Sequence, residues 1–314
     1  MDKYDILIVG CGPAGMTAGI YAARQEVKTI LFESKIPGGQ MAQTPFIENY
    51  PGYPEGIAGT TLSQKMKEQA EKAGAKVLME PVTELKMDNE QFILKTAKAE
   101  YKAWVVIFAT GAEHRKLGIP GEEEFRGKGV SYCTTCDAQF FRGRTVAVIG
   151  GGNTAVDSAL LLSKIAKKVY LIHRREEFRA DAATLKNLKQ SNVELIINTA
   201  ALEVLGGKLV TGLKVHNTKT NEEKIIETDG VFINIGVNPA SEMAGKIGAK
   251  LDEEGHVKVS REGATSIPGL YAAGDVIGGT KQITTAVGNG TKAALHAVKY
   301  LEQKTGMKTR AVDW

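Results

Sequence analysis

Cysteine is scarce in this sequence, with three residues among 314. Because this number is small and odd, a framework of structural disulfides is excluded. An excess of one charge sign is also lacking, since 40 lysines and arginines face 36 aspartates and glutamates and leave a net charge of +4. So small a surplus argues against binding to nucleic acid or to an anionic membrane. No apolar run approaches the ~18 residues that a membrane-spanning helix needs.

The N-terminal stretch, residues 1–9, lacks the basic region and the longer apolar region of a secretory signal peptide. We therefore expect a cytoplasmic protein. Hydrophobic residues make up 43% and charged residues 24% of the chain, which excludes a disordered or collagen-like protein. At roughly 150 residues per domain, the length predicts about two domains. Glycine is abundant, with 35 residues, and indicates many tight turns or close approaches of the backbone to a ligand.

Two segments of the sequence share one design: strand, glycine-rich turn, helix and second strand. This is the βαβ unit of a dinucleotide-binding fold, and it predicts an α/β protein with two such units. The first unit comprises residues 5–9, 10–15, 16–24 and 28–32, and the second comprises 145–149, 150–155, a helix from 156, and 169–172.

The glycine-rich turns carry the chemical prediction. In the first turn Gly10 forms the bend, Gly12 lets backbone N–H groups approach a pyrophosphate, and Gly15 lets the helix pack on the strand. Phosphates are favoured at the following helix N-terminus by its unpaired N–H groups and its dipole. The alternative is a pair of purely structural turns, but each glycine pattern has a strand before it and a helix after it.

The residues after each second strand distinguish two nucleotides. In the first unit Glu33 can accept hydrogen bonds from ribose hydroxyl groups, as in NAD or FAD sites. The second unit instead offers His173, Arg174, Arg175 and Arg179. Guanidinium groups suit a phosphate and favour NADP at this place. A solvated basic start of a helix is the alternative.

A third marker is Gly274-Asp275, after a strand at 269–273 and before an amphipathic helix at 284–301. An aspartate there can hold the ribityl chain of a flavin, or it can be an ordinary Asp turn. Strands at 105–111 and 232–236 close the first and second units. These positions predict that the first domain is interrupted by the second.

Cys133 and Cys136 form a Cys-x-x-Cys pair just before the second unit. Such a pair can carry out disulfide exchange, in which one sulfur attacks and the other resolves the mixed disulfide. Asp137 could move the proton that the leaving thiolate needs if burial raises its pKa, or it could be a structural cap. Zinc usually requires four ligands, whereas Cys11 lies in the first glycine-rich turn and the five histidines are scattered, so we expect no metal site.

Taken in order, these motifs resemble the low-molecular-weight thioredoxin reductases of the pyridine nucleotide–disulfide oxidoreductase superfamily over essentially the whole chain. The resemblance implies two Rossmann-like domains of three-layer ββα architecture, the second inserted into the first. It places the FAD-binding domain at 1–115 and 243–314 and the NADPH-binding domain, with the cysteine pair, at 116–242. It also implies a homodimer, and thioredoxin or a similar small redoxin as partner.

The resemblance assigns roles residue by residue. Cys136 would lie nearest the flavin and Cys133 would attack thioredoxin. Ala138-Gln139 and a loop at 276–281 that is about two residues short depart from the usual pattern of the family. The predicted FAD site comprises Gly10, Gly12, Pro13, Ala14, Gly15, Glu33, Gly39, Gln40, Asn49, Thr110, Gly111, Gly274, Asp275 and Gln282, and the predicted NADPH site comprises Gly152, Asn153, Thr154, His173, Arg174, Arg175, Arg179, Ile235 and Gly236.

The expected function is transfer of electrons from NADPH through FAD and the Cys133–Cys136 disulfide to thioredoxin. The nicotinamide and the cysteine pair must reach the same flavin, yet both belong to the inserted domain. We therefore expect that domain to rotate about linkers near 112–118 and 238–245 between the half-reactions. Another redoxin, a peroxidase component or oxygen as acceptor, and a non-catalytic redox sensor that binds dinucleotides, are the alternatives.

Overall fold

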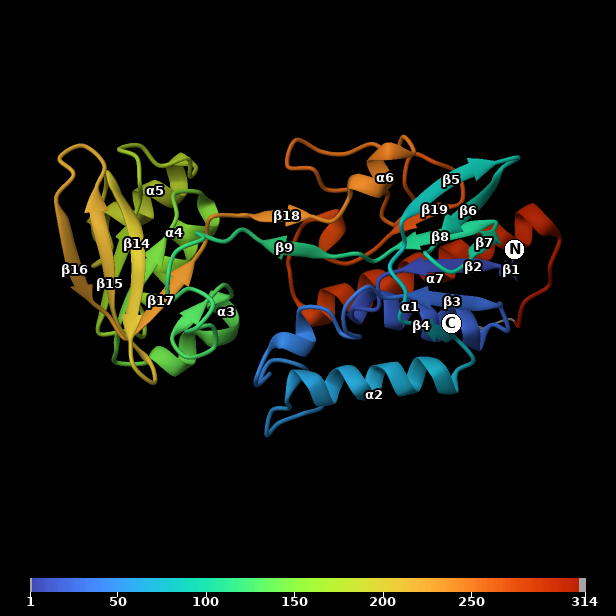
Figure 1. Cartoon of the computed structure of the whole chain (residues 1–314), viewed down its shortest axis with the longest axis horizontal. Helices are drawn as coiled ribbons and strands as arrows, with labels where there is room; N and C mark the ends of the chain where they lie inside the picture. The colour runs from blue at the N-terminus through green and yellow to red at the C-terminus, as the bar shows by residue number, and fades with distance from the viewer. Residues whose placement is uncertain (1, 311–314) are drawn as a thin grey trace. The chain divides into compact units, whose positions relative to one another are not determined.

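The structure, a computed structural model, describes residues 2–310, and the chain divides into two units by its internal contacts (Figure 1). Unit 1 comprises the described residues up to Glu113 and from Asn238 onward, and unit 2 is His114–Val237. The second unit is thus inserted into the first. The chain passes from unit 1 to unit 2 between residues 113 and 114 and returns between residues 237 and 238. The domain boundaries expected from the sequence follow residues 115 and 242.

The centre of unit 1 is a five-stranded parallel sheet in the order β19-β8-β2-β3-β4. Its inner strands are continuous runs of apolar residues that are buried on both faces, as parallel sheets require. The strands are β2 (Ile6–Val9), β3 (Thr29–Phe32), β4 (Lys76–Leu78), β8 (Val105–Phe108) and β19 (Leu270–Ala272).

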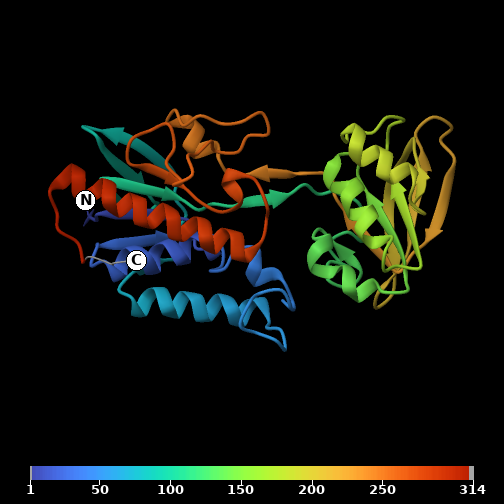
Figure 2. The same ribbon diagram turned by 180° about the vertical axis from the view of Figure 1, so that it is seen from behind.

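Alternate residues of this sheet face two different layers. Ile6 and Ile8 of β2 join one hydrophobic cluster with the helices, and Leu7 and Val9 join another with a second sheet. Figures 1 and 2 show this arrangement of helices, central sheet and outer sheet in unit 1. The helices are α1 (Pro13–Arg24), α2 (Gly59–Lys72) and α7 (Ile283–Thr305), and the outer sheet has the order β1 (Asp2–Lys3), β7 (Glu100–Ala103), β6 (Gln91–Lys95) and β5 (Glu84–Asp88).

Unit 2 repeats this three-layer design. Its parallel sheet has the order β10-β17-β11-β12-β13, with two helices on one face and an antiparallel sheet, β14-β15-β16, on the other. The predicted α/β fold of two Rossmann-like domains is therefore confirmed. The elements are β10 (Val130–Ser131), β11 (Thr145–Ile149), α4 (Asn153–Leu162), β12 (Lys168–Ile172), α5 (Ala182–Lys189), β13 (Glu194–Ile196), β14 (Thr199–Gly206), β15 (Val210–Asn217), β16 (Glu223–Glu227) and β17 (Gly230–Ile233).

The remaining elements are short. Two of them, β9 (Ala112–His114) and β18 (Val237–Pro239), pair with each other where the chain crosses between the units. Within residues 2–310, no helix is both long enough and apolar enough to cross a membrane. The others are η1 (Met41–Gln43), α3 (Thr134–Asp137), η2 (Ala138–Phe141), α6 (Glu242–Lys246) and η3 (Asp275–Ile277).

Candidate dinucleotide and disulfide sites

The residues predicted to bind FAD gather at the carboxyl ends of the parallel strands of unit 1. Gly10 follows β2, Glu33 follows β3, Thr110 comes two residues after β8, and Gly274 comes two residues after β19. In open α/β sheets this edge is where ligands bind. Gly39, Gln40 and Asn49 come from the loop after β3, Gly111 follows Thr110, Asp275 begins η3, and Gln282 is the N-cap of α7.

The glycines of the first turn serve two different purposes. A Cβ at Gly10 would overlap the carbonyl oxygen of Ala109, and a Cβ at Gly15 would overlap that of Gly10. These two glycines are therefore required by the fold itself. At Gly12 a Cβ would meet no atom within 4 Å. The open space at Gly12, beside the N-terminus of α1, is the cradle that a pyrophosphate needs.

The first turn of α1 is prepared for an anion. Pro13 occupies the start of the helix, where its missing N–H costs no hydrogen bond, and Ala14 and Gly15 follow. Gly12, the N-cap residue, has no side chain that could accept from the N–H groups of this turn. They stay available for phosphate oxygens, which the helix dipole also favours.

Glu33 braces the turn in this structure. Its Oε2 accepts from the backbone N–H of Cys11 at 3.0 Å, and its Oε1 accepts from those of Ser34 and Lys35 at 2.8 and 2.9 Å. The carboxylate thus ties the end of β3 to the glycine-rich turn. Oε1 already accepts two hydrogen bonds, but the second lone pair of Oε2 leaves capacity for a ribose hydroxyl group.

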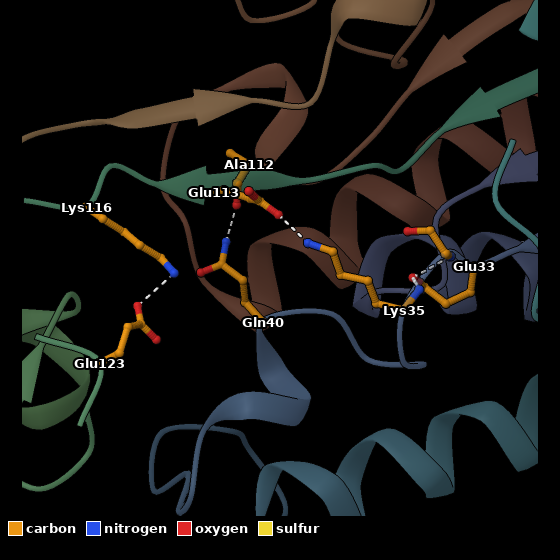
Figure 3. A network of polar contacts seen from close by, with 8 residues as sticks. Glu33, Lys35, Gln40, Ala112, Glu113, Lys116 and Glu123 are labelled. Carbon is orange, nitrogen blue, oxygen red and sulfur yellow. Dashed lines mark hydrogen bonds and ion pairs between the residues drawn. The ribbon is translucent and has the colours of Figure 1, made fainter. Parts of the chain in front are cut away.

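Loops from distant parts of the chain meet at this turn. Gly39 lies beside Gly12, because a Cβ at Gly39 would be 3.9 Å from the Cα of Gly12. Gln40 donates from Nε2 to the carbonyl oxygen of Ala112, and Lys35 forms an ion pair of 2.7 Å with Glu113 (Figure 3). These contacts hold the loop after β3 against the segment after β8.

Two more polar contacts involve predicted FAD residues. Asn49 donates from Nδ2 to Oε1 of Gln282 at 3.1 Å, across 233 positions of sequence. Thr110 donates from Oγ1 to the carbonyl oxygen of Ala240 at 2.7 Å. The fold therefore brings the predicted residues of unit 1 into one region at the sheet edge.

Asp275 lies close to the first glycine-rich turn. Gly274 before it packs against Ala14, since a Cβ at Gly274 would lie 2.9 Å from the Cβ of Ala14. Burial raises the pKa of the Asp275 carboxyl group, while the positive charge of Lys281 and the interaction with His256 oppose this rise. A half-buried carboxylate beside the glycine-rich turn is suited to accept from hydroxyl groups of a ligand.

The glycine-rich turn of unit 2 has the same construction. A Cβ at Gly150 would overlap the carbonyl oxygen of Asn234, whereas at Gly152 nothing would lie within 4 Å. Gly152 is the N-cap of α4 and has no side chain to cap it. Asn153 and Thr154 form the first turn, and Asn153 accepts from the backbone N–H of Asp181 at 2.8 Å. The cradle is thus present in both units.

His173 is part of the wall of this turn. It is 7% exposed, packs directly against Gly151 and stacks on Phe178 at 5.0 Å between ring centroids. Burial lowers the pKa of His173, and the hydrogen bond between Nε2 and the carbonyl oxygen of Glu177 partly opposes this. The charges of the neighbouring arginines lower the pKa further, so the imidazole is neutral near pH 7.

Two of the three arginines line a pocket. Arg174, Arg175 and Arg179 are exposed, and within the described chain none of them forms an ion pair. Arg175 and Arg179 line a pocket of about 390 Å³, together with residues 176–178. Glu176 of that lining is held by Lys219 at 2.6 Å, which offsets its negative charge. The pocket therefore offers two guanidinium groups to an anion, although the carboxylate of Glu177 also lines it.

Ile235 and Gly236 follow β17, so they lie at the same sheet edge as the glycine-rich turn. Ile235 packs against the hydrophobic cluster under the antiparallel sheet, and Gly236 has a positive φ of 102°. The Oδ1 atom of Asn234, just before them, is buried and has no hydrogen-bond partner. Sequence reasoning missed Asn234, because nothing in its pattern marks an unsatisfied amide.

Cys133 and Cys136 form a disulfide, with their Cα atoms 5.3 Å apart. Cys133 is the N-cap of α3 and Cys136 lies inside that four-residue helix. The backbone N–H groups of Cys136 and Asp137 both donate to the carbonyl oxygen of Cys133, at 3.3 and 3.1 Å. The third cysteine, Cys11, is buried, and burial raises the pKa of its thiol to about 12, so it is unreactive.

Asp137 ends α3 and is bonded to a buried serine that sequence reasoning missed. Ser131 donates from Oγ to Oδ2 of Asp137 at 2.6 Å. Burial raises the pKa of Asp137, and this hydrogen bond opposes the rise. A carboxyl group in this environment can hold a proton at a higher pH than an exposed aspartate.

Within the described residues, no group of three or more His, Cys, Asp or Glu side chains is arranged so that it could hold a metal ion. Each sheet edge carries a glycine-rich turn at a helix N-terminus, and α3 carries the disulfide.

Comparison with known proteins decides the family. A family model described as pyridine nucleotide-disulphide oxidoreductase matches residues 4–290. The chain belongs to this family. Among individual relatives of this oxidoreductase, thioredoxin reductase of Listeria monocytogenes is 43% identical over 304 residues, which cover 96% of this chain and 94% of the relative. Thioredoxin reductase of Bacillus subtilis is 41% identical, with coverages of 96% and 95%.

Solved structures agree with this assignment of the oxidoreductase. The crystal structure of thioredoxin reductase from Streptococcus pyogenes has a TM-score of 0.90 at 40% identity and covers 96% of this chain and 99% of that one. The resemblance to thioredoxin reductases predicted from the motifs is therefore confirmed. Membership in the pyridine nucleotide-disulphide oxidoreductases implies use of a flavin and of a pyridine nucleotide.

Proposed function

We propose that this oxidoreductase is an NADPH-dependent thioredoxin reductase that uses FAD and the Cys133–Cys136 disulfide. The observation that carries the proposal is that disulfide, which lies in a chain of this family with a complete strand, glycine turn and helix in each unit. Glu33 and Asp275 favour FAD in unit 1, and the arginines after β12 favour NADPH in unit 2.

The chain itself supplies the groups that act on the substrate disulfide. A bound flavin would supply the electron pair that opens the Cys133–Cys136 bond. The Cys133 thiolate then attacks one sulfur of the substrate disulfide, so that a bond forms between them and the substrate S–S bond breaks. The leaving sulfur takes a proton, for which Asp137 is the donor.

Cys136 completes the cycle. Its thiolate attacks the sulfur of Cys133, which forms the Cys133–Cys136 bond again and breaks the mixed disulfide. The second substrate sulfur leaves as a thiolate and takes its proton from solvent. The substrate gains two electrons and two protons in total, Asp137 regains its proton from solvent, and the enzyme returns to the disulfide state in which the structure shows it.

Rotation of unit 2 between the half-reactions is part of the proposal. The cysteine pair and the arginine pocket both belong to unit 2, whereas the predicted flavin residues belong to unit 1. Two chain crossings, at 113/114 and 237/238, form the only covalent links between the described units and can act as hinges. A non-reducible cross-link between the units should stop turnover, and unchanged turnover would refute the rotation.

The acceptor and the assembly rest on the resemblance. We propose thioredoxin as the substrate and a homodimer in the cytoplasm as the working form. Another small redoxin or a peroxidase component uses the same thiol chemistry and is the alternative acceptor.

The test of this function uses the purified full chain. It should be yellow, its flavin should bleach with NADPH in the absence of oxygen, and it should oxidise NADPH in the presence of thioredoxin. Turnover is measured with a panel of redoxins and a peroxidase component from the same cell. A protein that takes up no flavin, or that reduces none of these acceptors, would contradict the proposal.

The open space at Gly12 gives a specific prediction for the flavin site. Gly12→Ala should fold normally, because its Cβ meets no atom within 4 Å and its φ of −78° suits any residue. The methyl group would occupy the cradle, so we expect the flavin Kd to rise about tenfold or more, as for other close backbone approaches to pyrophosphate. Flavin titration of the apoprotein measures this effect.

Gly15→Ala is the matched control. Its Cβ would overlap the carbonyl oxygen of Gly10, so the fold should suffer as well as flavin binding, with a Tm several degrees lower. If Gly12→Ala bound flavin as tightly as the natural chain, the assignment of the cradle would be wrong.

A further inference from the structure

Ser131 is a buried side chain next to the redox turn for which the proposed mechanism has no role. It ends the short strand β10, is 5% exposed, and lies two positions before Cys133. Its hydroxyl oxygen has three polar neighbours: Oδ2 of Asp137 at 2.6 Å, the backbone nitrogen of Cys133 at 3.1 Å and the carbonyl oxygen of Cys133 at 3.3 Å. The hydroxyl thus touches both a reacting residue and the proton donor.

The hydroxyl has one proton and two acceptors that compete for it. The N–H of Cys133 donates to Oγ in either case and occupies one of its lone pairs. When Asp137 is ionised, Ser131 donates to the carboxylate. When Asp137 carries a proton on Oδ2, that proton can be donated to Oγ, and Ser131 can then donate to the carbonyl oxygen of Cys133.

We propose that Ser131 is a positioning residue for the reaction at the cysteine pair. Its hydroxyl holds Asp137 against the main chain of Cys133 in both protonation states and changes its hydrogen-bond acceptor when Asp137 gains or loses the proton. This inference rests on the proposed function, since it concerns the proton that the leaving substrate sulfur takes. Ser131 transfers no proton in this scheme, because its hydroxyl group only rotates from one acceptor to the other.

The hydrogen bond from Ser131 affects the protonation of Asp137. Two influences act on the pKa of this carboxyl group: burial, which raises it, and the hydrogen bond from Ser131, which lowers it. Removing the hydroxyl takes away a bond to the charged form, so the pKa should rise further. It also frees the carboxyl group to take other rotamers, so proton donation should become slower.

The structure offers a closely matched control. Ser158 on α4 is also a buried serine, 7% exposed, and it accepts a hydrogen bond of 2.9 Å from Thr134 of the same redox turn. It has no hydrogen bond with Asp137 in the described structure. Ser131→Ala and Ser158→Ala therefore each remove one serine hydroxyl group that contacts the redox turn. Of these two hydroxyl groups, only that of Ser131 is hydrogen-bonded to the carboxyl group of Asp137.

The experiment measures the pKa of Asp137 in the holoenzyme by NMR of 13C-labelled aspartate, with Asp137→Asn to assign the signal. Since a hydrogen bond to a charged group changes a pKa by about one unit, we expect a rise of about one unit in Ser131→Ala. The alkaline limb of the kcat profile for thioredoxin should move upward by the same amount, and kcat near pH 7 should fall about fivefold. Ser158→Ala should leave both the pKa of Asp137 and the alkaline limb of the kcat profile unchanged.

Two further variants guard against misfolding. Ser131→Thr keeps a hydroxyl group, whereas valine in Ser131→Val has the shape of threonine without a hydroxyl group. Only the valine variant should therefore show the pKa shift of Asp137. An unchanged pKa in both Ser131→Ala and Ser131→Val, or an equal shift in Ser158→Ala, would overturn the proposal. Because the NMR titration needs no redoxin, it separates this result from a failure of the natural chain to reduce thioredoxin, which would contradict the proposed function instead.

Discussion

Replacing Cys136 by serine is expected to lower the rate of NADPH-dependent thioredoxin reduction by about 10³-fold or more, the range seen when a covalent catalyst is removed. The reason is that the proposed mechanism passes electrons to thioredoxin through the Cys133–Cys136 disulfide, which this variant cannot form. Flavin content and bleaching by NADPH should stay unchanged, because the glycine-rich turns do not involve the cysteine pair. The measurement is NADPH oxidation with and without thioredoxin.

Cys133→Ser is the companion variant that separates the roles of the two sulfurs. It should lose turnover equally, but the two should differ in what they trap. Cys136→Ser retains the attacking sulfur and should form a stable mixed disulfide with a thioredoxin that lacks its resolving cysteine. Cys133→Ser should form none. Turnover above a tenth of the natural rate in either variant would show that the disulfide is not on the electron path.

The sequence predicted those parts of the fold that local pattern determines. The strand predicted at 145–149 coincides with β11, and the one predicted at 105–111 contains β8, because both are buried apolar runs with a glycine-rich segment after them. The inserted arrangement could be inferred because the strands that close each unit lie far from the first strands. The boundaries were less certain, since linker residues have no periodicity of their own.

The hydrogen-bond and ion-pair partners of side chains could not be predicted from the sequence where consecutive residues lie in different environments of the fold. Glu122 and Glu123 are consecutive, yet Glu122 is 2% exposed and accepts from Tyr132 and from two backbone N–H groups, whereas Glu123 pairs with Lys116 at 2.7 Å (Figure 3). No composition rule separates them. The buried carboxylate is the one that lies beside Tyr132 and the backbone N–H groups of Leu117 and Gly118 in the folded chain.

The same limit explains why Ser131 was missed. A serine two positions before a cysteine has no periodic or motif signal, and its contact with Asp137 arises only when the turn between them folds back on itself. Glycines at turns, in contrast, are visible in the sequence because steric demands of the backbone leave few alternatives. The predictable part of the site is therefore its backbone cradle, and the unpredictable part is the hydrogen-bond network that adjusts its proton donor.

The double variant Arg174→Ala with Arg175→Ala is expected to raise the KM for NADPH by about 30- to 100-fold while the KM for NADH changes less than about twofold. The guanidinium groups stand after β12, where the 2′-phosphate of NADPH distinguishes it from NADH. They act on a part of the nucleotide remote from the reacting ring. At saturating NADPH the kcat should therefore stay within about twofold of the natural value. Steady-state kinetics with both nucleotides measures these constants.

Lys186→Ala with Lys189→Ala is the matched control, because it removes two positive charges from the same unit at the far end of α5. If the arginines act only through the overall field of the unit, the lysine variant should raise the KM for NADPH to a similar extent, and the effect should fade with salt. If they bind the phosphate directly, the lysine variant should behave as the natural chain does. Equal rises for NADPH and NADH in the arginine variant would place the 2′-phosphate elsewhere and leave the arginines with a structural role around His173.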